Sequence, residues 1–491
     1  MALFDRRLLA YLDDGGWAGS GTFHDRIVGY QQVRRPRGMI GFITDCEGDY
    51  AYWSRCVSLS HIIQFGPEGQ LSFKRTEAED RFVFGGDVFD KGTGDLRIAR
   101  QLLDFKKRPS KDRVWLLAGN RDLNKLRFPA ELAEDELDVP QPVPLYPRAP
   151  PQVSLRSFLE KRLEGEGSEG GPKTIEDMNT KANRLRWILD HTMTAAGAFE
   201  LRREEMALLG GQEAGNISDQ EVVESFLASV AEEDGVVWQY LLHSSLLVLI
   251  GDCLFVHGGL PKEAINWIPT MDMRYVQPRE GAICGGRRVE GTLEDWMTAM
   301  MPGCSITWLH IENNFLQEGL QDFRAKMFWG PGRVRGGEGL LCLTSTPACF
   351  RRSVVVESLL QGGIPDHLDK EVEAFLVEGG VRTVFCGHKP CGDSPFVVRG
   401  ERVAVVHCDT TYSDASAADK RGSAVAAVEM DACSLGQLCL RGVLADGRGY
   451  DFTLYGAAGD AHVGRQCSDG SWVKAKLHDG CRWAFAGSFR S

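Results

Sequence analysis

The chain has 491 residues, of which 43% are hydrophobic and 25% are charged, and its 56 basic and 68 acidic side chains give a formal net charge of −12. This is the composition of an ordinary globular protein, and the length allows about two to four domain-sized units or one domain enlarged by insertions. The acidic balance, without any block of Lys and Arg, argues against duplex DNA or an anionic membrane as the main partner, because both need a basic face. A local basic pocket for a smaller anion stays open.

Cysteine usage and the N-terminus indicate the compartment. The 14 cysteines are scattered without any C-x-x-C pair, which favours neither a zinc ribbon nor a disulfide framework. The first residues place Asp5 and Arg6 inside a short apolar stretch, unlike the core of a signal peptide. The most apolar segment, 241–260, carries Asp252 and His257, so we expect no transmembrane helix. A cytoplasmic protein with reduced thiols is the resulting expectation.

Four short apolar runs end in polar residues, a pattern typical of buried strands in an α/β fold. The runs are 39–44, followed by Asp45; 81–84, followed by two glycines and Asp87; 113–118, followed by Gly119 and Asn120; and 381–386, followed by Gly387 and His388. Ligands of open α/β sheets bind beyond the carboxyl ends of strands, so we expect these polar residues to meet at one sheet edge. A hairpin is predicted for 246–250 and 253–256, with His257 closing its second strand.

A long segment interrupts the predicted strands. Residues 128–240 begin with a proline-rich stretch, 139–151, and a Gly/Glu connector, 164–171, and then show helical periodicity. We therefore expect a helical insertion, whose place after Asn120 makes it a candidate cap over the site. The expected organisation is an N-terminal extension over 1–38, a main domain over 39–440 containing the insertion, and a small β-rich C-terminal tail over 441–491.

The residues that carry chemistry fall in five short motifs. In chain order these are Asp45-Cys46-Glu47, Gly86-Asp87-Val88-Phe89-Asp90-Lys91-Gly92, Gly119-Asn120-Arg121-Asp122, Val256-His257-Gly258-Gly259 and Gly387-His388-Lys389-Pro390. Together they resemble the calcineurin-like metallophosphoesterase family, which includes Ser/Thr protein phosphatases and diadenosine tetraphosphatases. The resemblance implies an α/β fold, a two-sheet sandwich flanked by helices, and hydrolysis of a phosphate monoester or phosphoanhydride.

Carboxylates, an amide oxygen and imidazoles together suit Mn²⁺, Fe, Zn²⁺ or Mg²⁺ and leave room for water. The resemblance implies two divalent ions, Mn²⁺ foremost, which share Asp87 and activate a bridging water. By position it implies these metal ligands: Asp45, Glu47, Asp87, Asn120, His257 and His388. Asp49, His407 and Asp409 are reserve candidates, and core packing is the favoured interpretation of His407.

Two residues depart from the family pattern. Glu47 stands where the family usually has a histidine ligand, and its carboxylate favours a harder ion such as Mn²⁺ or Mg²⁺. Arg121 stands where the family has the histidine that protonates the leaving group, oriented by an aspartate at the place of Asp90. Arginine does not serve as an acid because its pKa exceeds about 12, but its planar fork can hold a phosphate oxygen. The general acid is therefore unassigned.

These departures shape the functional prediction. The predicted catalytic residues are Asp90 and Arg121, and the predicted substrate contacts are Lys91, Arg121, Arg333 and Arg335. Without a histidine acid, we expect good leaving groups, such as those of aryl phosphates and phosphoanhydrides, to be preferred over phosphoserine. The expected partner is a phosphorylated small molecule or nucleotide, with a phosphoprotein as the alternative. Two other functions stay open: a Ser/Thr protein phosphatase, and a catalytically impaired relative that binds a phosphorylated ligand.

Overall fold

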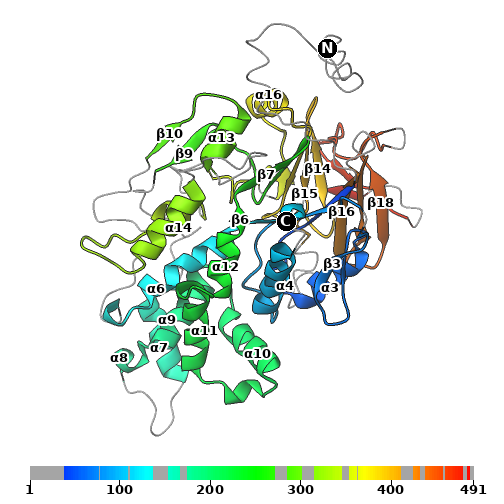
Figure 1. The fold of residues 1–491 in the computed structure, drawn as a ribbon. Helices are drawn as coiled ribbons and strands as arrows, with labels where there is room; N and C mark the ends of the chain where they lie inside the picture. The colour runs from blue at the N-terminus through cyan, green and yellow to red at the C-terminus, as the bar shows by residue number, and fades with distance from the viewer. Residues whose placement is uncertain are drawn as a thin grey trace.

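The computed structural model describes residues 38–76, 78–108, 111–136, 153–165, 174–270, 285–300, 315–344, 353–361, 363–410, 424–431, 437–456, 459–478 and 484–486. Two mixed β-sheets form the body of this described chain, and helices lie around them (Figure 1). It is an α/β protein, as predicted. None of the helices in the described ranges is long and apolar enough to cross a bilayer.

The larger sheet has seven strands and a parallel centre. In spatial order the strands are β18 (Gly449–Thr453), β17 (Gln437–Val443), β16 (Val425–Asp431), β1 (Met39–Ile43), β4 (Arg81–Phe84), β5 (Val114–Leu117) and β6 (Ser244–Ser245). β1, β4, β5 and β6 run parallel, whereas β16, β17 and β18 extend the sheet in antiparallel pairs. Parallel strands end at the same edge, so the loops after β1, β4 and β5 lie together there, as the sequence predicts.

The second sheet has five strands. In spatial order they are β14 (Phe396–Arg399), β15 (Ala404–His407), β13 (Thr383–Cys386), β8 (Cys253–Val256) and β7 (Leu247–Ile250). β8, β13 and β15 are parallel, with β7 and β14 antiparallel at the edges. The predicted hairpin is β7–β8, and His257 follows its second strand.

Alternating side chains join the two sheets face to face. Phe42 of β1 faces Phe255 of β8 and Phe385 of β13, at ring-centroid distances of 5.5 and 6.0 Å. Phe255 and Phe385 stack at 4.8 Å. Aromatic rings at these distances attract one another beyond their burial of apolar area. Three phenylalanines therefore pack between the two sheets, and each belongs to a strand that is followed by a predicted site loop.

The other face of the larger sheet is covered by α3 (Tyr50–Leu59) and α4 (Asp95–Lys107). Because side chains alternate along a strand, Phe84 of β4 points away from the second sheet and meets Trp53 of α3 edge-on at 5.9 Å. Two helices next to the second sheet are α13 (Leu293–Met300) and α16 (Lys370–Glu378), which meet through Trp296 and Phe375. Both faces of the sandwich are thus closed by apolar helix faces.

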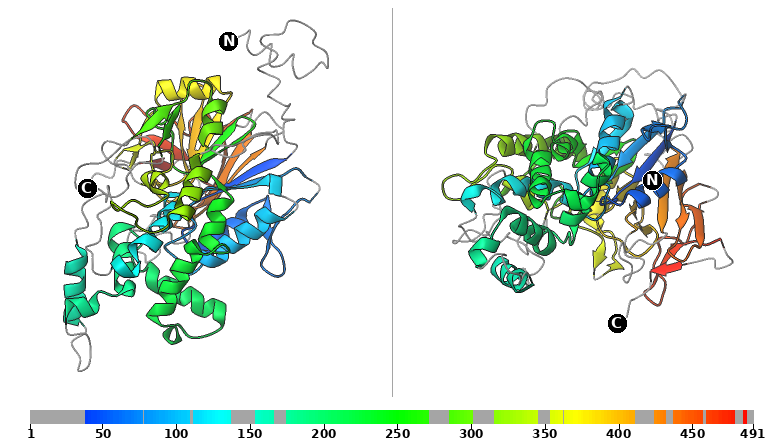
Figure 2. Two further views of the ribbon diagram at one scale, coloured as in Figure 1. Left: turned by 60° about the vertical axis from the view of Figure 1, so that its left-hand side comes forward. Right: turned by 90° about the horizontal axis from the view of Figure 1, so that it is seen from below.

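The described part of the predicted insertion, 128–240, consists mainly of helices. They are α6 (Phe128–Glu131), α7 (Leu155–Gly165), α8 (Ile175–Met178), α9 (Lys181–Trp187), α10 (Ala198–Gly210), α11 (Asp219–Ala231) and α12 (Val236–Leu242), and α5 (Asn120–Leu123) precedes the insertion. Figures 1 and 2 show α7 to α11 gathered at one end of the molecule. The N-cap residue of α11 is Ser218, whose hydroxyl accepts from the Glu221 N–H while the Glu221 carboxylate accepts from the Ser218 N–H. The proline-rich stretch 139–151 and most of the connector 164–171 lie outside the described residues.

The insertion is fastened to the core at α4. The carboxylate of Glu205, on α10, accepts the N–H groups of Leu96 and Arg97 at 3.0 and 2.9 Å. These N–H groups lie in the first turn of α4, whose N-cap residue is Gly94 and offers no side-chain acceptor. An acidic side chain from the insertion therefore caps a core helix and interacts favourably with its N-terminal dipole.

The remaining elements are short or lie near the C-terminus. They are α14 (Phe315–Ala325), α15 (Glu338–Cys342) and the paired strands β2 (Ile63–Phe65) with β3 (Leu71–Phe73), β9 (Trp267–Pro269) with β10 (Gly286–Arg288), β11 (Leu360–Gln361) with β12 (Ile364–Pro365), and β19 (Trp472–Ala475) with β20 (Ala484–Ala486). The predicted boundary at residue 440 falls inside β17, and β18 belongs to the large sheet. A strand pattern does not specify its pairing partner, and here antiparallel pairing to β16 carries the sheet into the predicted tail.

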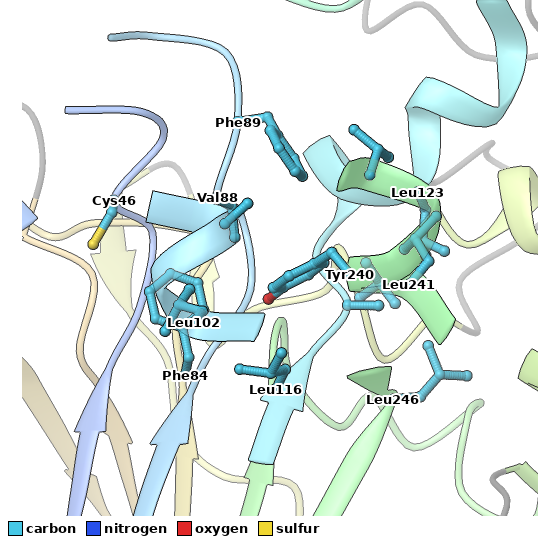
Figure 3. Close-up of a cluster of buried hydrophobic side chains, with 14 of the residues drawn as sticks. Cys46, Phe84, Val88, Phe89, Leu102, Leu116, Leu123, Tyr240, Leu241 and Leu246 are labelled. Atoms are coloured by element: carbon cyan, nitrogen blue, oxygen red, sulfur yellow. The ribbon is translucent and has the colours of Figure 1, made fainter. Parts of the chain in front are cut away.

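Apolar residues inside the polar motifs anchor the loops at the sheet edge. Cys46, Val88, Phe89 and Leu123 are fully buried in one cluster, and Figure 3 shows their side chains around Tyr240 of α12. The Tyr240 hydroxyl donates to the carbonyl of Leu117, the last residue of β5, at 2.7 Å. Each loop thus turns its apolar residues into the core, which fixes where its charged residues point.

Candidate metal centre

The polar strand ends from both sheets meet and hydrogen bond to one another. The carboxylate of Asp45, after β1, accepts the backbone N–H of His388, after β13, at 3.0 Å. The Nδ1 atom of His257, after β8, lies 2.7 Å from the carbonyl of Gly85, after β4. These contacts connect the two sheets at the edge where the sequence predicts a site. The structure therefore brings together residues that are up to 343 positions apart in the chain.

The backbone at this edge is held in an unusual conformation. Five of the eight non-glycine residues with positive φ in the described chain lie here: Asp45, Glu47, Asp87, Asp90 and His388, with φ of 53°, 48°, 54°, 111° and 69°. Each such residue costs about 1–3 kcal/mol, and such strain is concentrated at functional sites. The fold therefore maintains this geometry at a cost in stability, as expected of a site.

Two glycines let the loops approach one another. A Cβ atom on Gly119 would lie 2.1 Å from Asp87 Oδ1, and one on Gly387 would lie 2.0 Å from Asp45 Oδ2. Neither separation is possible for real atoms, so any side chain here would displace a carboxylate. Gly119 and Gly387 are consequently required by the site itself rather than by the flexibility of a turn.

One group of side chains has the arrangement of a metal site. Single donor atoms of Asp87, His257 and His388 all lie within 4.8 Å of one another. Asn120 joins this group, because its Oδ1 lies 3.3 Å from His257 Nε2. Asp87 and His257 are buried, whereas Asn120 and His388 are partly exposed. The group could hold a metal ion that is open to solvent on one side.

The protonation of His257 follows from its neighbours. A carbonyl oxygen only accepts, so Nδ1 carries the proton that is donated to Gly85. Nε2 lies 3.3 Å from Asn120 Oδ1 and 3.4 Å from Asp87 Oδ1, which are both acceptors, so it faces a position where a proton or a metal ion would sit. Three electron-rich atoms therefore converge on one position, which favours a cation there. The Gly85 carbonyl fixes the ring as outer partners of metal-bound histidines do.

The pKa values of His257, Asp87 and Asp45 reflect the charges that surround this position. Burial by itself lowers the pKa of His257, but the carboxylates of Asp87 and Asp45 outweigh it and raise the pKa to about 10. Burial raises the pKa of Asp87, but His257 and Arg121 outweigh it and hold that pKa below its ordinary value. Burial and the neighbouring Asp409 raise the pKa of Asp45. The potential around His257 Nε2 and Asp87 is therefore strongly negative and attracts positive charge.

Asp122 holds the Asp87 loop in place. Its Oδ2 atom accepts the N–H groups of Asp87 and Gly119 at 2.9 and 2.8 Å, and its Oδ1 accepts the N–H of Val88 at 2.9 Å. Burial and the charge of Asp87 raise the pKa of Asp122 to about 7. Asp122 thus shapes the loop ends from a position with no access to solvent.

Glu47 is already neutralised by two cationic side chains. Its Oε1 lies 2.5 Å from Arg121 Nε, and its Oε2 lies 2.8 Å from Lys91 Nζ. The sequence predicts Glu47 as a metal ligand and both cations as substrate contacts. In the structure both cations bind Glu47, and Arg121 also lies 3.7 Å from Asp87.

Asp90 lies beside two cationic side chains, those of Arg121 and Lys125. Its Oδ1 lies 2.6 Å from Nζ of Lys125, and its Oδ2 lies 3.4 Å from Nη1 of Arg121. Lys125 is 1% exposed and also donates to the Arg121 carbonyl at 2.8 Å. The sequence analysis did not identify Lys125. Its position four residues after Arg121, in a helical stretch, is the signal that could have placed it on the same face.

The insertion reaches the site through Asp95. The Asp95 Oδ1 atom accepts the N–H of Asp90 at 3.0 Å, while Oδ2 lies 3.4 Å from Nη2 of Arg202 on α10. Burial raises the pKa of Asp95 to about 7, although Arg202 opposes this shift. No motif in the sequence connects Asp95 with Arg202, because they meet only through the packing of α10 on α4.

The other predicted anion contacts are paired with carboxylates. Arg333 contacts both oxygens of Glu136, at 3.0 and 2.6 Å. Arg335 is fully buried and lies 3.1 Å from Glu131 Oε1. The partners of these two guanidinium groups, Glu136 and Glu131, do not belong to the group around Asp87.

The reserve candidates occupy supporting positions. Asp49 caps α3, because its Oδ1 accepts the Tyr52 N–H at 2.8 Å. His407 is buried and stacks on Phe396 at 4.2 Å, and burial lowers its pKa to about 3. Asp409 is buried and lies near enough to Asp45 to raise its pKa.

The family resemblance implies two metal positions, and the residues present suit a divalent ion at only one of them. Around Asp87, Asn120, His257 and His388, oxygen and nitrogen lone pairs converge, which suits a divalent ion. The second position would need Glu47 together with Asp45 and Asp87. There the Glu47 carboxylate is bound to Arg121 and Lys91, so this set does not fit a second ion as it stands.

Comparisons with known proteins identify phosphatase structures at low similarity. No protein-family model and no curated protein sequence matches the chain. Among solved structures, a cold-active protein-tyrosine phosphatase from a psychrophilic Shewanella species matches with 14% identity and a TM-score of 0.41, covering 86% of this chain and 82% of that one. A protein serine/threonine phosphatase from Saccharomyces cerevisiae matches with 11% identity and a TM-score of 0.31, covering 80% and 73%. At TM-scores below 0.5 such matches do not transfer an activity.

Proposed function

We propose that this protein is a metal-dependent phosphoesterase of the calcineurin-like class, which hydrolyses a phosphate monoester or a phosphoanhydride. The observation that carries the proposal is the convergence of Asp87, Asn120 and the Nε2 atom of His257 on one position, with His388 beside it. Cationic side chains from Lys91 and Arg121 lie next to this group. A metal position beside fixed positive charge is what phosphoryl transfer requires.

The chain's own residues divide the work as follows. Asp87, Asn120, His257 and His388 would hold a divalent ion, for which Mn²⁺ is the proposed metal. The bound ion supplies an activated water at neutral pH and charge for the phosphoryl oxygens. Asp122 and the Gly85 carbonyl keep Asp87 and His257 oriented. Arg121, held between Glu47 and Asp90, would stabilise charge that develops on phosphate.

The direct test is phosphate release from p-nitrophenyl phosphate by the full chain supplied with Mn²⁺, Mg²⁺ or Zn²⁺. We expect activity to fall to background after removal of metal with a chelator and to return when the metal is restored, because the activated water depends on the ion. Activity that survives complete chelation, with metal content checked by atomic absorption, would contradict the proposal. The same assay without any turnover, but with measurable phosphate binding, would favour a phospho-ligand binder, the second candidate.

The substitution of arginine for the histidine acid gives a prediction about substrate. The Arg121 guanidinium lies against Glu47, Asp87 and Asp90 and does not give up a proton at neutral pH. An alkoxide leaving group needs an acid more than a phenolate or phosphate does. We therefore expect kcat/KM for an aryl phosphate or a dinucleoside polyphosphate to exceed that for a phosphoserine peptide by at least about a hundredfold, the low end of general acid effects. The reverse order would favour a Ser/Thr protein phosphatase.

A further inference from the structure

The environment of Arg121 differs from that of an ordinary surface arginine. Its guanidinium lies among three carboxylates from two loops, with Nε 2.5 Å from Glu47 and 3.7 Å from Asp87. Nη1 is 3.4 Å from Asp90. The Arg121 side chain is 9% exposed, so solvent screens these interactions weakly. One buried positive charge therefore touches the carboxylate shared with the histidine group and two others.

The charges around Arg121 balance. Lys91 completes the neutralisation of Glu47 at 2.8 Å, and Lys125 that of Asp90 at 2.6 Å. Three cationic side chains thus face the three carboxylates of Glu47, Asp87 and Asp90. A divalent ion placed between Glu47 and Asp87 would have to displace Arg121 or lie against it, and like charges at such short range repel strongly.

The histidine side of Asp87 has the opposite character. There Asp87 Oδ1 accepts the Arg121 backbone N–H at 2.8 Å and lies 3.4 Å from Nε2 of His257. The other neighbour of Nε2 is the amide oxygen of Asn120. The contacts of Nε2 are therefore oxygen acceptors rather than cations, and a metal ion there would satisfy them.

From this contrast we infer that the protein binds one divalent ion per chain, on the histidine side of Asp87, and that the Arg121 guanidinium occupies the place of the second. The inference rests on the proposed function, because it concerns the same centre, and it replaces the two ions that the sequence resemblance implies. A guanidinium can neutralise carboxylates and hold a phosphate oxygen, but it offers no coordination position to water. Arg121 would thus take over the second ion's electrostatic role and not its role in activating water.

Metal counting tests this inference without reference to turnover. The full chain, stripped with a chelator, is titrated with Mn²⁺ by calorimetry, and bound ions are counted by atomic absorption after dialysis. We expect one ion per wild-type chain, and two in Arg121→Met, where the guanidinium no longer lies against Asp87 and the Oε1 atom of Glu47, although Lys91 still contacts Oε2. Electron paramagnetic resonance should change from the spectrum of an isolated Mn²⁺ to that of a coupled pair.

Two variants control for the loss of an arginine from a group of carboxylates. Arg186 also contacts two carboxylates, those of Glu200 and Asp219, but it lies in the insertion. Arg186→Met should stay at one ion, as should Arg121→Lys, which keeps a positive charge. Two ions in the wild type would overturn the inference while leaving the proposed function intact, and this count does not depend on any variant folding. One ion in a folded Arg121→Met, shown by its circular dichroism, would also overturn it. No bound ion in the wild type would overturn both proposals.

Discussion

Replacing Asp87 with asparagine is expected to lower metal-dependent phosphate release by about a thousandfold or more, equivalent to roughly 4 kcal/mol of activation free energy. Asp87 is the carboxylate that faces both His257 Nε2 and the Arg121 guanidinium. An amide has the same shape but carries no charge, so it would weaken the binding of a cation between Asp87 and His257. The hydrogen bond to the Asp122 carboxylate is donated by the backbone N–H of residue 87 and should persist.

The measurement is kcat/KM for p-nitrophenyl phosphate at saturating Mn²⁺, together with the number of ions bound. Asp369→Asn is a matched control: Asp369 caps α16 by accepting the N–H groups of Glu371 and Val372, a role that asparagine also fills. We expect the control to keep wild-type activity. If Asp87→Asn retained more than a tenth of the activity, the metal centre would have to be assigned elsewhere.

Replacing Glu131 with glutamine is expected to destabilise the fold by about 3–5 kcal/mol, because it leaves buried positive charge uncompensated. Glu131 lies between Arg127, at 2.9 Å, and Arg335, at 3.1 Å, and none of the three side chains is more than 1% exposed. The carboxylate joins α6 to the segment before α15. Glutamine could accept a hydrogen bond from one arginine but would neutralise neither.

The pH dependence has a definite sign. Burial raises the pKa of Glu131, but Arg127 and Arg335 outweigh it and hold the pKa below its ordinary value of 4.5. A carboxyl with a lower pKa in the folded state contributes stability above its unfolded pKa and loses it as the pH falls through the folded pKa. The stability difference between wild type and Glu131→Gln should therefore be full at neutral pH and should shrink below about pH 4.5.

Urea unfolding of both proteins at several pH values gives this difference. Glu200→Gln is the matched control, because Glu200 also contacts two arginines, Arg186 and Arg203, but its side chain is 52% exposed. Exposed ion pairs contribute at most about 1 kcal/mol. An equal loss of stability in both variants would mean that burial is not what makes the Glu131 pair important.

Much of the centre could be predicted from local patterns. A polar residue directly after a buried strand lies at the sheet edge whatever the rest of the chain does, so Asp45, Asp87, Asn120 and His388 meet as expected. The hairpin of β7 and β8 was likewise readable from its Gly-Asp turn. Strand periodicity and turn chemistry are properties of neighbouring residues, which is why the sequence reveals them.

The arginine–carboxylate pairs could not be predicted from local sequence patterns. The sequence offered Glu47 as a metal ligand and Arg121, Arg333 and Arg335 as anion contacts, on the basis of residue type and position. The fold pairs these arginines with Glu47, Glu136 and Glu131. Which carboxylate an arginine meets depends on how separate segments pack, and several of these partners are far apart in the chain.

The sequence alone therefore determined the α/β class, the strand-end motifs and the ligand types gathered around Asp87. Only the tertiary structure decided that Arg121 lies inside the carboxylate group, that α10 reaches the site through Arg202 and Asp95, and that β17 and β18 complete the larger sheet. The physical reason is the separation along the chain of the residues that interact. Backbone conformation and apolar periodicity are fixed by near neighbours, whereas ion pairing, helix packing and strand partnership are selected by the burial of surfaces that meet only in the folded chain.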